Sequence, residues 1–324
     1  MINLSVGPSR LVVLVSVVAA ALLLLPSEQP RAPPLLALRR SIDGSVHGGS
    51  GTDEVVLAIA VLSRGGADGV ARRATYRRTT LALLRAAGRA LNMSVAARFF
   101  LGAAPAPPPP SRVGEMSAAE QADADANAAP LLPDVERVPG RGEHDLWVRT
   151  HRASRWGADL NARFWVKTDD DAFVRADTLL AELAGPGADK PSSRLYWGRE
   201  VGPGKALKWI GGCQYETIFV HAECPRYMTG LGYVLSGDLV RFVASLDLDH
   251  YYKINDGWQE DANMGLILSG LDLVRIDDER FHDVHGSHPQ IQRPLSAASV
   301  VAHKLSEPEL LAAYEAFGPG LGAG

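Results

Sequence analysis

The stretch 164–173, Phe-Trp-Val-Lys-Thr-Asp-Asp-Asp-Ala-Phe, holds the densest group of residues able to do chemistry. Its apolar run predicts a strand, and three carboxylates, Asp169, Asp170 and Asp171, follow at the carboxyl end. Ligands of open α/β sheets bind there, and carboxylate oxygens suit Mn²⁺ or Mg²⁺, which neutralise a diphosphate. An acidic helix start or a solvated turn would explain the same residues. Because adjacent acids repel unless a cation lies among them, a metal site is favoured.

A second charged group consists of four arginines, which lie after the first predicted strand, 55–62, and the turn that follows it. One helix is expected there, with an apolar face that includes Tyr76, Leu83 and Leu91. Cations in the first half of a helix oppose its dipole unless an anion compensates them. A nucleotide or phosphate seat and a solvated basic face explain this equally well. The arginines are Arg72, Arg73, Arg77 and Arg78.

The composition is that of a globular chain with a full core. Of 324 residues, 46% are apolar and 22% are charged. The formal net charge of −4 and the isoelectric point near 6.1 give no electrostatic reason to expect nucleic acid as a partner. The composition therefore favours a small anionic ligand held by a local site.

The N-terminal region predicts attachment to a membrane. Residues 11–25 form an uncharged apolar run between Arg10 and Pro26, shorter than the ~20 residues of an average span. A cleaved signal peptide is the alternative, but the run ends without an Ala-x-Ala-like site. We therefore expect an uncleaved signal anchor, with residues 1–10 in the cytosol and the rest in the lumen.

The rest of the chain divides by composition. Residues 26–52, rich in Pro, Gly, Ser and Arg, are expected to form a stem, and 53–317 the folded domain, with a tail at 318–324. A Pro-rich then Ala-rich acidic segment, about 103–142, is expected to be a mobile loop within that domain.

Two features depend on a secretory location. Cys213 and Cys224 are near enough in sequence to form one loop-closing disulfide in an oxidising compartment, although two buried free thiols would be equally consistent. Asn92-Met93-Ser94 is an N-glycosylation sequon.

The order of motifs along the chain resembles the β-1,3-glycosyltransferases of the GT31 family. The likeness covers roughly residues 55–314, and no single motif is specific by itself. Within the family, the galactosyltransferases that build the glycosaminoglycan linkage region look most similar. After the apolar run and stem come Arg-Arg-x-x-x-Arg, Lys-x-Asp-Asp-Asp-x-Phe, Tyr-Trp-Gly, Gly-x-Gly-Tyr-Val-Leu-Ser, Glu-Asp and Val-x-His-Lys.

The resemblance implies a GT-A fold, which is Rossmann-like, with a mixed, mostly parallel sheet between helices. It also implies a UDP-sugar donor, Mn²⁺ or Mg²⁺, and a single-pass type II Golgi membrane protein with a luminal catalytic domain. By the family's motifs Asp171, Asp169 and His303 would bind the metal. The predicted contacts to the nucleotide and the metal's waters are Arg73, Arg77, Lys167, Asp169 and Asp170. Without the motif, His303 would be read as a histidine packed at a strand end.

The Glu260-Asp261 pair matches the family's Glu-Asp motif, whose aspartate is expected to be the base. An inverting transfer needs a carboxylate opposite the leaving UDP to take the proton of the acceptor hydroxyl. Asp261 is also readable as an ordinary helix N-cap, and a helix start would lower its pKa. Trp197 and Trp258 are candidates to stack on a sugar, with core packing at least as plausible, and Gly232 marks a close approach to the backbone.

The expected reaction is transfer of galactose from UDP-galactose to the 3-hydroxyl of a glycan or glycoprotein acceptor. N-acetylglucosamine transfer, a non-catalytic sugar-binding relative and a metal-dependent phosphohydrolase are the alternatives. Three departures from the family bear on acceptor choice and donor fit. The family's Trp is missing after Arg77-Arg78-Thr79, Ala262 replaces Val after Glu-Asp, and 143–154 barely matches the usual segment.

Overall fold

The apolar run predicted as the first strand is an interior strand, β1, of a seven-stranded sheet with the order β3-β2-β1-β4-β7-β6-β8. The computed structural model describes residues 55–104, 116–140, 145–201, 226–247, 260–286 and 289–318, all within one compact unit, Asp43–Gly324. β7 runs antiparallel to both of its neighbours, whereas the other neighbouring strands pair in parallel. The strands are β1 Leu57–Ser63, β2 Val95–Leu101, β3 Val135–Arg137, β4 Phe164–Asp169, β6 Leu195–Val201, β7 Tyr227–Ser236 and β8 Val274–Asp277.

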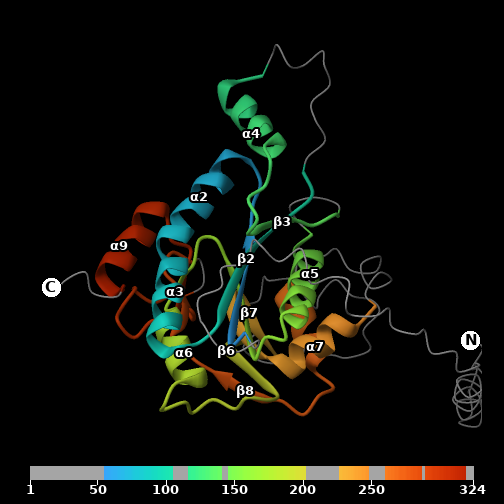
Figure 1. The fold of residues 1–324 in the computed structure, drawn as a ribbon, viewed down its shortest axis with the longest axis vertical. Coiled ribbons are helices and arrows are strands. Elements are labelled where there is room, and N and C mark those ends of the chain that lie inside the picture. The colour runs from blue at the N-terminus through green and yellow to red at the C-terminus, as the bar shows by residue number, and fades with distance from the viewer. Residues whose placement is uncertain are drawn as a thin grey trace, which may run out of the picture. The chain divides into compact units, whose positions relative to one another are not determined.

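Helices cover both faces of this sheet (Figure 1). Side chains of a strand alternate between faces, and all seven residues of β1 are buried, so this strand needs a cover on each side. Leu57, Ile59 and Val61 pack toward α2 Gly66–Arg78, α3 Thr80–Leu91 and α6 Ala176–Ala184. The alternate residues pack toward α5 Leu146–Asp159, α7 Gly237–Ser245 and α8 Glu260–Leu268. The mixed, mostly parallel α/β architecture expected from the sequence is thus confirmed.

A three-stranded sheet adds the segment that carries His303. Its order is β5-β10-β9, with β5 Phe173–Val174, β9 Phe281–Asp283 and β10 Val301–His303. β10 pairs in parallel with β9 and antiparallel to β5, which follows the acidic end of β4 closely. Helix α9, Glu307–Phe317, then begins with a capping box of Ser306 and Glu309, whose spacing is visible in the sequence. The C-terminal part of the chain is thereby brought beside the acidic triplet.

The expected single helix after β1 is in fact two helices. Thr79 separates α2 from α3, and its hydroxyl donates to the carbonyl of Thr75, 2.9 Å away. Side-chain bonds of this kind compete with the helical backbone pattern. The arginines therefore lie in the second half of the short helix α2.

The expected mobile loop, 103–142, contains ordered structure among its described residues. Helix α4, Ala118–Ala128, has its own capping box, and β3 extends the main sheet. Asp123 accepts from the amide of Ala67 at 2.9 Å, and Asn127 accepts from that of Gly66 at 3.1 Å. These two side chains satisfy the exposed amides at the start of α2, where the sequence suggested a phosphate seat.

Several predictions fall outside the described residues. These are the anchor at 11–25, the stem at 26–52, Cys213, Cys224 and Trp258. Across the described ranges, no helix combines the length and apolar character needed to span a membrane.

Candidate active site

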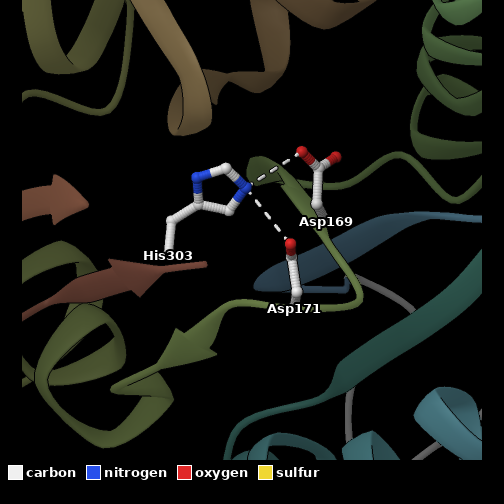
Figure 2. A group of neighbouring side chains, drawn as sticks. All are labelled: Asp169, Asp171 and His303. Carbon is white, nitrogen blue, oxygen red and sulfur yellow. Dashed lines mark ion pairs between the residues drawn. The ribbon is translucent and has the colours of Figure 1, made fainter. Parts of the chain in front are cut away.

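Asp169, Asp171 and His303 form a compact group of possible metal ligands at the carboxyl end of β4 (Figure 2). One ligand atom from each lies within 4.8 Å of the others. Nε2 of His303 is 3.1 Å from Oδ1 of Asp171 and 3.4 Å from Oδ2 of Asp169. Two carboxylate oxygens and one imidazole nitrogen suit Mn²⁺ or Mg²⁺ supplemented by water or substrate oxygens.

Cations already compensate the acids of this group. Burial alone would raise the pKa of Asp169, but Lys167 and His303 outweigh it and hold that pKa well below its usual range. Burial would lower the pKa of His303, but its bonds to Asp169 and Asp171 raise it well above the usual value. Arg72, one Nη of which is 3.9 Å from Asp171, adds a third positive group that was not among the predicted contacts. The negative charges of the aspartates are therefore balanced by positive side chains of the protein.

Asp170 points away from this group, toward the end of β1. The hydroxyl of Ser63 donates to its Oδ2 at 2.6 Å, and Arg73 donates to the same hydroxyl at 2.9 Å. Burial raises the pKa of Asp170 to about 6, against the effect of Ser63. Arg73 also donates to the carbonyl of Arg64, so it supports the β1 turn. Direct contact of Asp170 or Arg73 with a nucleotide stays a prediction.

Lys167 joins the acidic end of β4 to the Glu260-Asp261 pair. Its ammonium lies 3.0 Å from Asp169, 3.1 Å from Glu260 and 2.5 Å from the carbonyl of Gly230. Burial would lower its pKa, but the carboxylates of Asp169 and Glu260 raise it above the usual value. In this structure the ammonium is engaged by these three groups of the protein, and direct contact of Lys167 with a cofactor stays a prediction. Lys167 links the carboxylate of Asp169 to that of Glu260.

Glu260 and Asp261 are neighbours in sequence with different surroundings. Glu260 is 3% exposed, and its Oε2 accepts from Thr150 and Tyr233, each at 3.1 Å. Burial raises the pKa of Glu260 to about 6, opposed by Lys167. With Oε2 held by two hydroxyl donors and Oε1 paired with Lys167, Glu260 is suited to position α8, and its predicted catalytic role stays a prediction.

Asp261 is only half-buried, with its carboxylate beside β7. The amide of Gly230 donates to Oδ2 at 2.8 Å, and the amide of Ala262 donates to Oδ1 at the same distance. The backbone amides at the helix start lower the pKa of Asp261 as expected, but burial outweighs them and raises it above the usual value. A carboxylate with a raised pKa is a better proton acceptor than an ordinary surface aspartate.

Arg77 is not placed to receive a phosphate. Its guanidinium forms a bidentate pair with Asp134, with distances of 2.7 and 2.8 Å, and lies over the ring of Phe99. This fork-to-fork pairing uses the geometry that would otherwise grip a phosphate. The predicted nucleotide contact of Arg77 is therefore corrected to a link between α2 and the segment before β3.

Trp197 and Gly232 are both part of the packing. Trp197 is 0% exposed, packs edge-on against Phe281, and donates its indole N–H to Asp278 at 3.0 Å. A fully buried indole cannot stack on a sugar, so that prediction is wrong. Gly232 has a φ of +154°, and a Cβ there would lie 3.0 Å from Val301, so its close neighbour is β10 rather than a substrate.

Sequence reasoning missed residues that hold the site together. Tyr233 lay inside a family motif, but only the register of β4 with β7, which pairs it with Lys167, gives it a role. Thr150 and Asp283 carried no signal, because neither lies in a recognised motif. Asp283 is 2.7 Å from Nδ1 of His303.

Comparison with known proteins identifies similar enzymes. Residues 145–279 match the Galactosyltransferase family. Mouse "Beta-1,3-galactosyltransferase 6" is 30% identical over 259 residues, which is 78% of this chain and 71% of the mouse protein. Human "Beta-1,3-galactosyltransferase 1" is 27% identical over 145 residues, and that match covers 43% of this chain and 42% of the human one.

Two further matches are a plant enzyme and a solved structure. "Hydroxyproline O-galactosyltransferase GALT6" of Arabidopsis thaliana is 33% identical over 143 residues, or 43% of this chain and 20% of the plant protein. A solved crystal structure of an active-site mutant of LgtC aligns with a TM-score of 0.40 at 12% identity, over 83% of this chain and 98% of the other.

Proposed function

The chain belongs to the β-1,3-galactosyltransferase family, and from this premise we propose that it transfers galactose from UDP-galactose to the 3-hydroxyl of an acceptor sugar with inversion. The fold proposed for it is GT-A. The acceptor proposed is a glycan or glycoprotein of the proteoglycan-linker type. One observation supports this best: Lys167 ties the Asp169, Asp171 and His303 group to the segment that carries Asp261.

The residues of the acidic group suit a divalent cation. Their donor atoms are oxygen, oxygen and nitrogen within 4.8 Å, and three positive side chains now neutralise the acids. Asp169, Asp171 and His303 would hold Mn²⁺ or Mg²⁺, which when bound supplies positive charge for the departing diphosphate. No protein acid is then needed at the leaving oxygen.

Asp261 is proposed to take the proton of the acceptor hydroxyl. Two backbone amides orient its carboxylate, and burial raises its pKa, so it is held in place yet able to accept a proton. Glu260 fixes the start of α8 through Thr150, Tyr233 and Lys167. By fixing the start of α8, the buried Glu260 thus determines where the half-buried Asp261 points.

The test is transfer from labelled UDP-galactose by the full chain, with Mn²⁺ or with EDTA, to a panel of sugar acceptors. Asp261→Asn should lower kcat by roughly 10²–10⁴-fold while leaving UDP affinity unchanged, because only the proton acceptor is lost. Asp272→Asn, which changes an aspartate whose side chain is 87% exposed, is the matched control.

Three results would contradict the proposal. Full turnover by Asp261→Asn would remove the base assignment. Faster transfer from UDP-N-acetylglucosamine would assign the alternative donor. Tight UDP binding without turnover on any acceptor would indicate a non-catalytic sugar-binding relative.

We also propose that the chain is a type II Golgi membrane protein, anchored by residues 11–25, with its catalytic domain in the lumen. The support is the uncharged apolar run after Arg10 and the sequon at Asn92, which has use only in that compartment.

A further inference from the structure

Asp283 is a buried carboxylate directly behind the imidazole of His303. β9 and β10 pair in parallel with His303 opposite Asp283, which brings the two side chains to the same place along the sheet. Oδ1 of Asp283 is 2.7 Å from Nδ1 of His303, and Oδ2 is 3.0 Å from the ammonium of Lys304. Asp283 is only 2% exposed, so both of its oxygens are used within the protein.

This contact decides which nitrogen of His303 keeps its proton when a cation replaces the proton on the other one. A carboxylate accepts a hydrogen bond and cannot donate one, so the Asp283 contact requires a proton on Nδ1. The other nitrogen, Nε2, then faces Asp169 and Asp171 at 3.4 and 3.1 Å. When the imidazole is neutral, its lone pair is directed into the acidic group, which is the arrangement a metal ligand needs.

The backbone around this pair is fixed on both sides. The amide of Val284 donates to the carbonyl of His303, and the amide of Leu305 donates to the carbonyl of Asp171, each at 2.9 Å. Lys304 adopts a left-handed conformation with a φ of 64°, which is unusual for a residue with a side chain. The sharp turn at Lys304 therefore fastens the strand end that carries His303 to the loop that carries Asp171.

The carboxylate has little freedom to swing away. A Cβ added at Gly286 would lie 2.3 Å from Oδ2 of Asp283, which shows how tightly the following turn lies against that oxygen. The ammonium of Lys304, whose side chain is 40% exposed, closes the same oxygen from the other direction. Asp283 is thus held in a single orientation.

We propose that Asp283 is a positioning residue that fixes the tautomer and the orientation of His303 for ligation of a divalent cation, with Lys304 balancing its charge. This inference rests on the proposed metal-dependent function. Carboxylates that accept from a metal-binding histidine commonly contribute roughly 10–100-fold to metal affinity. Asp283 lies outside every motif that pointed to the site.

A purely structural role would look different. If Asp283 served only to join β9 to β10, its replacement would lower stability and leave the affinity for metal unchanged. Asp278 offers a matched comparison on the neighbouring turn, because it is also a carboxylate held by protein donors. Those donors are Arg280 and Trp197, and neither belongs to the acidic group.

The experiment titrates the full chain with Mn²⁺ in the presence of saturating UDP and follows free Mn²⁺ by electron paramagnetic resonance. Asp283→Asn should weaken Mn²⁺ binding roughly 10–100-fold, because an amide can turn its NH₂ toward Nδ1 and favour the wrong tautomer. Asp278→Asn should bind Mn²⁺ as the parent does, even where its unfolding midpoint in urea is lower.

Each result has a defined meaning. Binding by Asp283→Asn within about twofold of the parent, against the roughly 10–100-fold loss expected, overturns the positioning role but leaves the proposed function standing. A parent chain that binds no Mn²⁺ overturns the metal-dependent function and this inference with it.

A second measurement needs no folded variant at Asp283. In ¹⁵N-histidine spectra of the parent with UDP and diamagnetic Mg²⁺, the resonance assigned to His303 by its loss in His303→Gln should show a protonated Nδ1 and an unprotonated Nε2. An unprotonated Nδ1 contradicts the proposal directly.

Discussion

At the scale of single residues, Lys167 is the charge that keeps two acidic groups together. Its side chain is 3% exposed, as is that of Glu260, so their pairing takes place away from water. A buried pair of this kind adds little net stability, but removal of one partner leaves an uncompensated buried charge. The main effect of removing Lys167 would therefore be an unpaired buried carboxylate at Glu260.

Lys167→Met is expected to lower the free energy of unfolding by about 3–5 kcal/mol, measured in urea. Burial already raises the pKa of Glu260 to about 6 from 4.5, and loss of Lys167 would raise it further. A group with a raised folded-state pKa contributes stability that is complete below its unfolded pKa and is lost as the pH rises through the folded one. The loss of unfolding free energy in Lys167→Met should therefore be smaller at a pH near 4.5, the unfolded pKa of Glu260, than at a pH well above its folded pKa of about 6.

The control is Lys190→Met, a lysine whose two acidic partners, Glu182 and Asp189, lie nearer the surface. It should cost less, because exposed pairs contribute little. Equal costs for the two variants at both pH values would contradict the linking role of Lys167.

Trp197 gives a second prediction at this scale. Trp197→Phe should lower the free energy of unfolding by roughly 1–3 kcal/mol, because it leaves a void and removes the hydrogen bond to Asp278. The KM values for donor and acceptor should stay unchanged. Trp165→Phe, at another fully buried indole, is the control. A selective rise in KM for Trp197→Phe would restore the sugar-stacking hypothesis.

Residue types predicted the chemistry of the site better than the role of each residue. Three adjacent aspartates favoured a metal site and the family resemblance added His303, but the sequence could not show that Asp170 points to Ser63. Nor could the sequence show which of Glu260 and Asp261 is buried. Two adjacent residues at a helix start face different directions, and only the fold determines which of them faces the core. Those distinctions depend on packing.

At the scale of elements, α4 acts as a cap for α2. Asp123→Ala should destabilise the protein by about 1 kcal/mol, because the amide of Ala67 at the start of α2 loses its acceptor. Amide hydrogen exchange of Ala67 should become faster. Asp125→Ala, which removes only a contact to Gln121 within α4, is the control and should leave that exchange rate unchanged. Equal exchange in both variants would contradict the capping role.

Elements with strong patterns were predicted well, and those determined by distant contacts were not. The apolar run of β1 and the capping box of α9 are local signals, and both are found in the structure. The break at Thr79 and the order of α4 depend on side chains that bond to particular backbone groups, which hydrophobic periodicity does not report.

At the scale of the whole chain, the proposed topology makes Asn92 luminal. This residue follows the end of α3, in a left-handed conformation, and begins one of two sequons, the other being Asn3-Leu4-Ser5. Expressed in cells with a secretory pathway, the parent should shift on a gel after removal of N-linked glycans. Asn92→Gln should abolish that shift, whereas Asn3→Gln should not. A shift retained in Asn92→Gln would contradict the orientation.

The site as a whole depends on three distant parts of the chain meeting at one end of the sheet. β4 supplies the acids and Lys167, α8 supplies Asp261, and the small sheet supplies His303 and Asp283. The family resemblance predicted this meeting, and Lys167 is the physical link between its two halves. The central claim is that one assembled site holds the leaving diphosphate and the base together.

The most direct test is a crystal structure of the protein with Mn²⁺ and UDP, in which anomalous scattering locates the ion. We predict the ion bound by Asp169, Asp171 and His303, the diphosphate on the same ion, and the carboxylate of Asp261 facing the open position next to the β-phosphate. An ion bound elsewhere, or an Asp261 carboxylate turned away from the nucleotide, would contradict this prediction.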